Sequence, residues 1–147
     1  CNNFSPDIDA CDPSQSLNEY GRLYSKYAVD DARGLCPSGW HVPTDGEWTV
    51  VTDVLGGESV AGGQMKTTYG WNNGGNGTNS SGFSGLPGGY RYGSSGLFNY
   101  AGLNGYWWSS SPYGSDAWRL NYYNEGVSRS NDNQRNGFSV RCVRDAE

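Results

Sequence analysis

The chain has 147 residues, enough for one domain with a single hydrophobic core. Its 23 glycines and an apolar fraction of only 35% argue against a helical bundle, and its 14% of aromatic residues argues against a disordered chain. The net charge of -5 and the scattered Lys and Arg residues exclude a basic nucleic-acid surface, and no apolar run approaches the roughly 20 residues of a membrane span. Composition therefore predicts a loop-rich single domain over residues 1–147.

The first 35 residues predict an extended segment, a strand and a short helix, in that order. Residues 1–19 are polar and contain two prolines, which predicts an extended segment. Closely spaced aromatic residues then predict a strand over 20–27. The sequence AVDDARGL predicts a short helix over 28–35, which ends before a Cys-Pro pair.

A second helix has a stronger signal in PTDGEWTVVTDVLGG. Thr44 followed three residues later by Glu47 matches a capping box, and two glycines supply the stop. Trp48, Val51 and Leu55 are spaced to form one apolar face, so we expect that face to pack on the core.

Residues 56–105 predict a long-loop region, because Gly, Asn, Ser and Thr dominate them. The stretch WNNGGNGTNSSG, residues 71–82, has almost no apolar side chains. Isolated large residues indicate that this region packs against the rest of the domain. These expected anchors are Trp71, Phe83, Leu86, Tyr90, Tyr92, Phe98 and Tyr100.

The last part of the chain, residues 105–145, predicts a terminal antiparallel sheet. Its candidate strands span residues 105–111, 116–123, 126–130 and 137–144. In the second of these strands, period-two alternation places Trp118, Leu120 and Tyr122 on a buried face. Arg119, Asn121 and Tyr123 then point the other way.

Four cysteines, Cys1, Cys11, Cys36 and Cys142, allow three disulfide pairings. We favour an oxidising compartment over a zinc site, because no CxxC occurs and the chain has one histidine. Alternation in the last strand turns Cys142 inward, which makes Cys36 the natural partner. An acylated Cys1, as in a bacterial lipoprotein, is the alternative for the N-terminus. The first ten residues do not resemble a signal peptide, so we expect a mature chain or one cut from a longer protein.

Five motifs occur in an order typical of a known family: YGRLYSKYAV, CPSGWHVPTDGEW, SGFSGLPGGYRYG, GYWWSSSP and GFSVRCVRD. Over residues 20–145 the chain resembles the Fibrobacter succinogenes major paralogous domain, a bacterial surface-protein module. The resemblance implies a disulfide-stabilised α+β fold of the C-type lectin type, with two helices, a long-loop insertion and a small twisted sheet. It also implies the bridges Cys1–Cys11 and Cys36–Cys142. A Trp and ENL stretch usual upstream is missing, which favours a fragment or a shortened domain.

The resemblance extends to the formylglycine-generating enzyme superfamily, yet we expect no enzymatic activity. His41 is the one histidine, and we interpret it as a packing or hydrogen-bonding residue. An oxidase of the formylglycine-generating type is the less favoured alternative, since every cysteine has a structural explanation. We expect no cofactor. Lectin-type calcium tripeptides are absent, and the acidic pairs Asp7/Asp9 and Asp30/Asp31 are interpreted as solvated charges, which leaves a calcium ion open.

The most informative functional signal is a segment rich in Tyr, Asn, Ser and Asp near the C-terminus. Such a composition is typical of antibody binding loops, where Tyr supplies contact area and the small polar residues supply adaptable hydrogen bonds. We therefore predict a ligand-binding face made by Tyr113, Asp116, Arg119, Asn121, Tyr123, Asn124, Glu125, Ser128, Ser130, Asn131, Asp132, Asn133 and Asn136.

The expected function is recognition of a glycan or a surface protein, as in adhesion, by a secreted or cell-surface domain. Nucleic acid and membrane insertion are not expected. The similarity to retroelement-diversified C-type lectin domains suggests a diversified face over residues 113–136. A structural subunit of a surface filament or repeat assembly, with self-association through the same face, is the alternative function.

Overall fold

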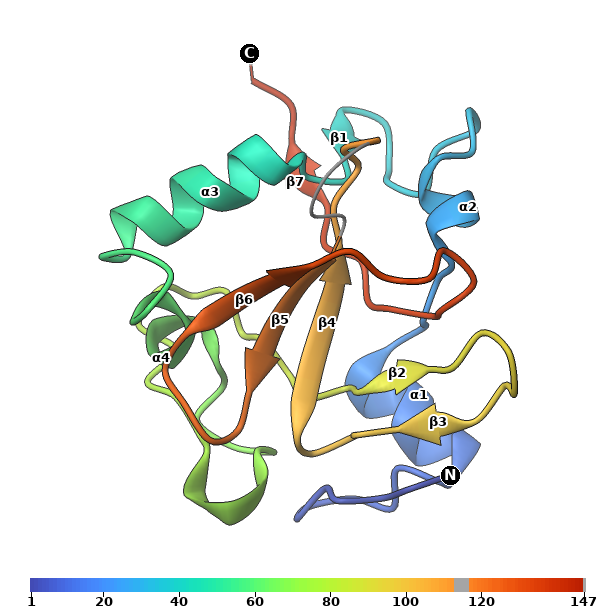
Figure 1. Cartoon of the computed structure of the whole chain (residues 1–147), viewed down its shortest axis with the longest axis vertical. Helices are drawn as coiled ribbons and strands as arrows, with labels where there is room; N and C mark the ends of the chain where they lie inside the picture. Colours follow the sequence, from blue (N-terminus) through green and yellow to red (C-terminus); the bar gives the residue numbers. More distant parts are fainter. Residues whose placement is uncertain (113–116, 147) are drawn as a thin grey trace.

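The computed structural model describes residues 1–112 and 117–146. It is an α+β structure in which short helices surround small antiparallel sheets, and two disulfides tie it together (Figure 1). In chain order its elements are α1 (Pro13–Tyr20), α2 (Lys26–Val29), β1 (Trp40–His41), α3 (Asp45–Val54), α4 (Ala61–Met65), the 3₁₀ helix η1 (Asn72–Gly74), β2 (Tyr90–Arg91), β3 (Phe98–Asn99), β4 (Asn104–Trp108), β5 (Ala117–Asn121), β6 (Val127–Ser130) and β7 (Val143–Arg144).

The central sheet has the strand order β4-β5-β6 and is antiparallel throughout. Trp107 on β4 pairs with Trp118 on β5, while Tyr106 pairs with Arg119. Because successive side chains point to opposite sides of a sheet, the two tryptophans share one face and Tyr106 and Arg119 share the other. We call the second side the polar face; its residues are Asn104, Tyr106, Arg119, Asn121 and Ser128.

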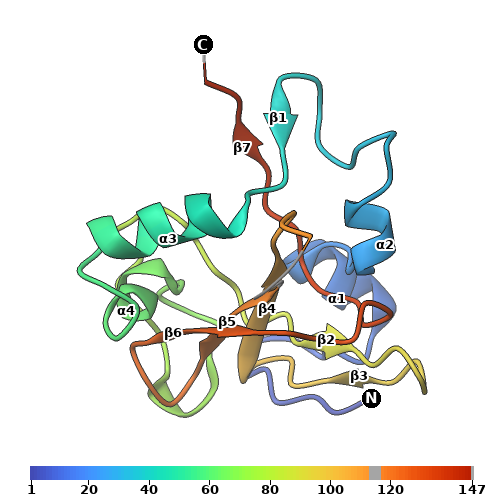
Figure 2. The same ribbon diagram turned by 45° about the horizontal axis from the view of Figure 1, so that its top comes forward.

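The tryptophan side of the sheet packs against α3 and α4, which lie on one side of β5 and β6 (Figure 2). Trp48 of α3 stacks on Trp118 with ring centroids 5.7 Å apart. The Trp118 indole Nε1 donates to Asp45 Oδ1 at 3.1 Å, and Arg129 binds the other oxygen of that carboxylate at 3.0 Å. Arg129 also lies 5.1 Å above the Trp118 ring, so one aromatic side chain links three elements.

Helix α3 confirms the predicted capping box. The Thr44 hydroxyl accepts from the Glu47 amide, and the Glu47 carboxylate accepts from the Thr44 amide at 2.8 Å. The predicted apolar face is only partly right, because Val51 is 39% exposed. Trp48 and Thr52, one turn apart, are the residues that α3 buries, so the helix is rotated away from Val51.

The N-terminal predictions need correction. The segment expected to be extended contains α1, which Asp12 caps through the amides of Ser14 and Gln15. These hydrogen bonds, first that from the Ser14 hydroxyl, lower the pKa of Asp12 to about 2. The strand expected over 20–27 is reduced to one bridge between Tyr24 and Phe138, because Lys26–Val29 forms the single turn α2. The helix expected over 28–35 thus ends at Val29.

The long-loop prediction over 56–105 missed α4 and the β2–β3 hairpin. Helix α4 contains Gly62 and Gly63, which lower helix propensity in a sequence pattern. Tertiary contact explains the first of them, since a Cβ at Gly62 would lie 2.4 Å from the Gly126 carbonyl oxygen. Close packing of α4 on the turn after β5 therefore requires glycine there.

Both predicted disulfides are confirmed. Cys1 pairs with Cys11, Cys36 pairs with Cys142, and none of the described cysteines is free. The last predicted strand, residues 137–144, is shorter than expected, since only Val143–Arg144 forms a ladder, with β1. Earlier in that segment only isolated bridges occur, at Gly137, Phe138 and Ser139.

A second core covers one end of the polar side of the sheet. Trp108 stacks on Phe138 at 4.3 Å, and its indole Nε1 donates to the Tyr24 carbonyl at 2.6 Å. Ala117, Val29, Val42 and Tyr106 complete this cluster. Beyond Tyr106, the other end of that side carries Asn104, Arg119 and Asn121.

Candidate functional site

The floor of the candidate site is the polar face of the β4-β5-β6 sheet. The Asn104 amide donates to the Tyr106 hydroxyl at 3.0 Å, and the paired strand places Arg119 beside the same tyrosine. Burial raises the pKa of Tyr106, while the hydrogen bond from Asn104 and the nearby Arg119 guanidinium act in the opposite direction. Tyr106 therefore stays a neutral hydrogen-bonding phenol at ordinary pH.

Two buried donors on this floor have no acceptor. Among the described residues, Arg119 Nε and Asn121 Nδ2 are buried and make no hydrogen bond. The two residues occupy successive positions of β5 on the polar face. A buried donor without an acceptor lowers the free energy of unfolding by about 1 to 3 kcal/mol, so two neighbouring ones destabilise the fold.

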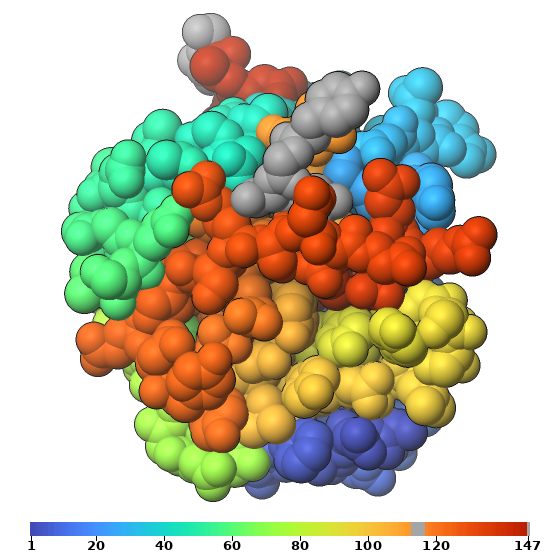
Figure 3. All heavy atoms as spheres, viewed as in Figure 1, coloured from blue at the N-terminus to red at the C-terminus, as the bar shows by residue number. Residues whose placement is uncertain are grey.

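Tyrosines of the β2–β3 hairpin border the floor on one side. Tyr90 stacks on Tyr100 at 5.9 Å and meets Tyr92 and Tyr106 edge to face at 6.3 and 5.3 Å. Tyr92 and Tyr100 are exposed. Figure 3 shows residues 90–100 (yellow) on the same face of the molecule as β5 and β6 (orange). The hairpin therefore adds an aromatic rim to the polar floor.

The turn after β5 forms a second border, and a buried cation fixes it. Lys66 Nζ donates to the carbonyl oxygens of Asn121 and Asn124 at 3.1 and 2.9 Å and lies 5.2 Å above the Trp71 ring. Burial lowers the pKa of Lys66, an effect that Glu125 opposes. The turn presents Tyr123, which is 65% exposed.

The segment after β6 forms a third border. Ser130 Oγ donates to Asp132 Oδ2 at 2.5 Å. Asn136 Oδ1 accepts from the Gly93 amide at 2.9 Å, which joins this segment to the β2–β3 hairpin. Three chain segments thus border the polar floor. The turn after β5 and the segment after β6 are close in sequence, whereas the β2–β3 hairpin comes from an earlier part of the chain.

A comparison with protein families matches residues 3–144 to the Fibrobacter succinogenes major domain. The chain belongs to that family. Comparisons with curated proteins and with solved structures gave no match. The match to the Fibrobacter succinogenes major domain begins before α1, so it includes most of the N-terminal segment as well as the five motifs up to Arg144.

The structure separates the predicted site residues into groups. Tyr113 and Asp116 lie outside the described residues. Asn121 and Asn136 were expected on the surface, but they are buried, at 2% and 5% exposed. Asn121 belongs to the polar floor, and Asn136 is hydrogen-bonded to the β2–β3 hairpin through the Gly93 amide. Four of the predicted residues are half-buried: Arg119, Ser128, Ser130 and Asp132. Five are exposed: Tyr123, Asn124, Glu125, Asn131 and Asn133.

Sequence reasoning missed part of this site. It treated Tyr90, Tyr92 and Tyr100 as packing anchors and did not select Asn104 or Tyr106. Exposure of the hairpin tyrosines depends on how β2 pairs with β3, with Tyr90 opposite Asn99, and no periodic pattern announces two-residue strands. The one available signal was the density of tyrosine in GGYRYG.

Metal-binding clusters and helices that could span a membrane are both absent from the described residues. No group of three His, Cys, Asp or Glu among them is arranged to hold a metal ion. Within residues 1–112 and 117–146, no helix has the length and apolar character needed to cross a bilayer. The two disulfides fit an oxidising, extracellular environment.

His41 lies outside this site, between two carboxylates. Its Nδ1 is 2.6 Å from Asp145 Oδ1, and its Nε2 is 2.9 Å from Glu47 Oε1. Hydrogen bonds to Asp145 and then to Glu47 raise the pKa of His41. The Thr44 amide, more than His41, lowers the pKa of Glu47. The raised pKa of His41 and the lowered pKa of Glu47 together widen the pH range over which an imidazolium faces an ionised carboxylate.

We expect this arrangement to stabilise the fold most at mildly acidic pH. A group whose pKa is higher in the folded state stabilises below its unfolded pKa, about 6.5 for His, and loses that effect as the pH rises through the folded value. The difference in unfolding free energy between wild type and His41→Gln should therefore shrink from pH 6 to pH 9. NMR titration of His41 gives the direct check. A measured pKa at or below the ordinary value would contradict the expected ion pairs.

Proposed function

We propose that the chain is an extracellular recognition domain with a C-type lectin-like fold. It binds through the polar face and the surrounding tyrosines, without catalysis and without a cofactor. The ligand is rich in oxygen acceptors, as a glycan or the polar surface of a protein is. The pair of unsatisfied donors, Arg119 Nε and Asn121 Nδ2, is the observation that carries the proposal.

An acceptor-rich ligand would relieve the cost of those donors. Binding would supply the missing hydrogen bonds through the side-chain rotamer changes that are common at interfaces. The exposed rings of Tyr92, Tyr100 and Tyr123 offer contact area at low conformational cost, and they suit the apolar faces of sugar rings as well as protein side chains. The buried Lys66 clamp keeps the turn that carries Tyr123 in place before binding.

We expect Arg119→Met to separate binding from stability. Methionine keeps much of the arginine stem. It removes an unsatisfied buried donor but also the hydrogen bond between Arg119 and Tyr106, so the two effects oppose each other and the free energy of unfolding should change by no more than about 1 kcal/mol. Affinity for the ligand should fall by about tenfold or more, and Tyr123→Ala should do the same if Tyr123 is a hot spot. Glycan and surface-protein arrays would select the ligand, and calorimetry would measure both quantities.

Matched controls come from exposed residues elsewhere. Arg33→Gln removes a guanidinium that is paired with Asp31, and Tyr69→Ala removes an exposed tyrosine of the long-loop region. Both variants should bind like wild type. Equal affinity for wild type and Arg119→Met would refute the proposed face, and filaments formed by the purified chain would favour the structural-subunit alternative.

A further inference from the structure

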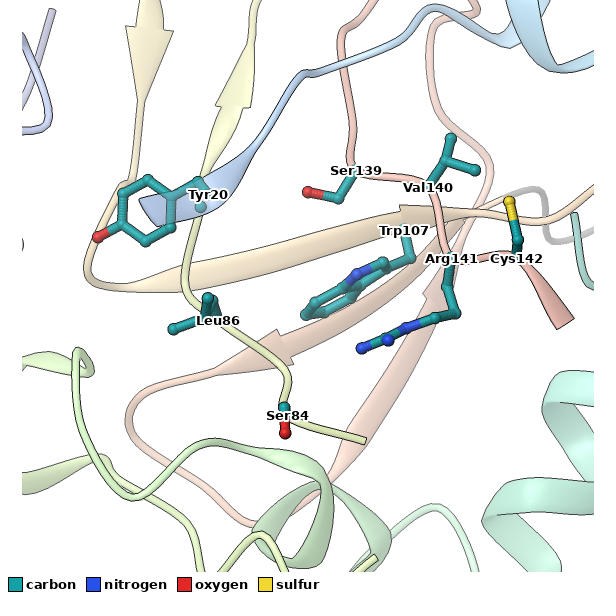
Figure 4. A pocket seen from close by; sticks show the side chains of 9 residues that line it. Tyr20, Ser84, Leu86, Trp107, Ser139, Val140, Arg141 and Cys142 are labelled. Carbon is teal, nitrogen blue, oxygen red and sulfur yellow. The ribbon is translucent and has the colours of Figure 1, made fainter. Parts of the chain in front are cut away.

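A cavity opens on the other side of the sheet, away from the polar face. Its volume is about 320 Å³. It lies between residues 139–142, the loop that carries Ser84 and Leu86, and Tyr20 at the end of α1 (Figure 4). Trp107, whose ring belongs to the tryptophan side of the sheet, forms one wall, and Leu86 and Val140 add apolar surface. A cavity of this size is at the lower end of the range for small-molecule sites.

Arg141 is the charged residue of this cavity. Its guanidinium lies 4.6 Å from the centre of the Phe83 ring, and Nη2 donates to the Phe83 carbonyl oxygen. Figure 4 shows the side chain extending alongside the Trp107 indole. These contacts hold the planar group in one orientation at the cavity wall.

Arg141 forms no ion pair with any described carboxylate. Burial alone lowers its pKa, with no acidic neighbour opposing the effect. A second cavity, also about 320 Å³, shares Arg141 and contains Glu47. That carboxylate is already engaged, by His41 Nε2 at 2.9 Å and by the Thr44 amide at 2.8 Å. Among the described residues, Arg141 is therefore a half-buried cation without a counter-ion.

The chemistry of the Arg141 guanidinium indicates which kind of ligand group would pair with it. It has five N–H donors in a planar fork, and the structure shows one of its nitrogens engaged, with the Phe83 carbonyl. A carboxylate matches that fork with two parallel hydrogen bonds, and partial desolvation makes a charge-assisted pair stronger than it would be in water. The hydroxyls of Ser84 and Ser139 lie at the same cavity and suit polar substituents.

We propose that this cavity binds a small monocarboxylate with a flat apolar body. The carboxylate pairs with Arg141, and the body lies against Trp107 and Leu86. This site is separate from the polar face, so it adds a second ligand to the recognition domain and does not depend on the first.

Benzoate is the probe. Benzamide, which has the same ring but an uncharged amide in place of the carboxylate, is the control. In ¹⁵N-labelled protein, benzoate should shift the Arg141 Nε and Trp107 Nε1 resonances in a saturable way, while benzamide should not. Arg141→Gln should weaken benzoate binding by about tenfold or more, because it removes the charge and the fork. Arg33→Gln, which removes an exposed guanidinium paired with Asp31, should leave benzoate binding unchanged.

Each alternative to this proposal predicts a different outcome of these titrations. Absence of saturable shifts, equal shifts with benzamide, or equal affinity in Arg141→Gln would overturn the proposal. Inorganic phosphate binding as tightly as benzoate would overturn the carboxylate assignment in favour of a tetrahedral anion. If Arg141→Gln fails to fold, the benzoate and benzamide titrations of the wild-type chain decide the matter, with the Trp107 indole as reporter.

Discussion

Replacing Cys36 and Cys142 together by serine should lower the free energy of unfolding by about 4 to 5 kcal/mol, the value for a bridge that closes a loop of roughly 100 residues. The two cysteines are 106 residues apart in sequence, and their bridge joins the loop after α2 to the segment before β7. Its loss would enlarge the unfolded ensemble across most of the chain. Urea unfolding under non-reducing conditions, which keep the wild-type bridges intact, gives the measurement.

The other disulfide is the internal control. Cys1 and Cys11 are separated by 10 residues, so the same reasoning gives a smaller loss, about 3 kcal/mol or less, for Cys1→Ser with Cys11→Ser. Equal losses for the two double variants, or a larger loss at the N-terminus, would contradict the expected dependence on loop length.

Trp118→Ala should destabilise the fold by about 3 to 5 kcal/mol, the range for truncating a buried aromatic side chain. Trp118 is 1% exposed and stacks on Trp48. Its removal also leaves the carboxylate of Asp45 without the indole donor. Chemical denaturation followed by far-UV circular dichroism measures the loss independently of tryptophan fluorescence.

Tyr123→Ala is the matched control for this prediction. Tyr123 lies just beyond the end of β5 but is mostly exposed, so its truncation should change stability by only about 0.5 kcal/mol. A Trp118→Ala variant as stable as Tyr123→Ala would mean that the alternation of β5 has been assigned to the wrong faces.

Local signals explain which parts of the fold the sequence predicts well. The capping box before α3 is a direct interaction between Thr44 and Glu47, so three residues of sequence suffice to recognise it. Alternation in β5 is equally local and correctly places Trp118 and Leu120 in the core. Helix α4 depends instead on contact between Gly62 and the Gly126 backbone, which no local pattern contains.

The candidate site is harder to predict because it is assembled from distant segments. The sequence identifies Arg119, which lies in the middle of the regular strand β5, and Tyr123, which lies just after its end. It places Asn136 on the binding surface, whereas the hydrogen bond to Gly93 draws that side chain inside. The rim tyrosines could not be selected, since two-residue strands such as β2 are defined by pairing and not by periodicity.

Amide chemical-shift mapping tests whether the polar face is the binding surface. The ¹⁵N-labelled chain would be titrated with the array-selected ligand. If the ligand binds to the polar face, the largest shifts should fall on residues 90–100, 104–106 and 119–123, and Arg119→Met should abolish them while the protein stays folded. Largest shifts in residues 56–82, with binding retained by Arg119→Met, would contradict it.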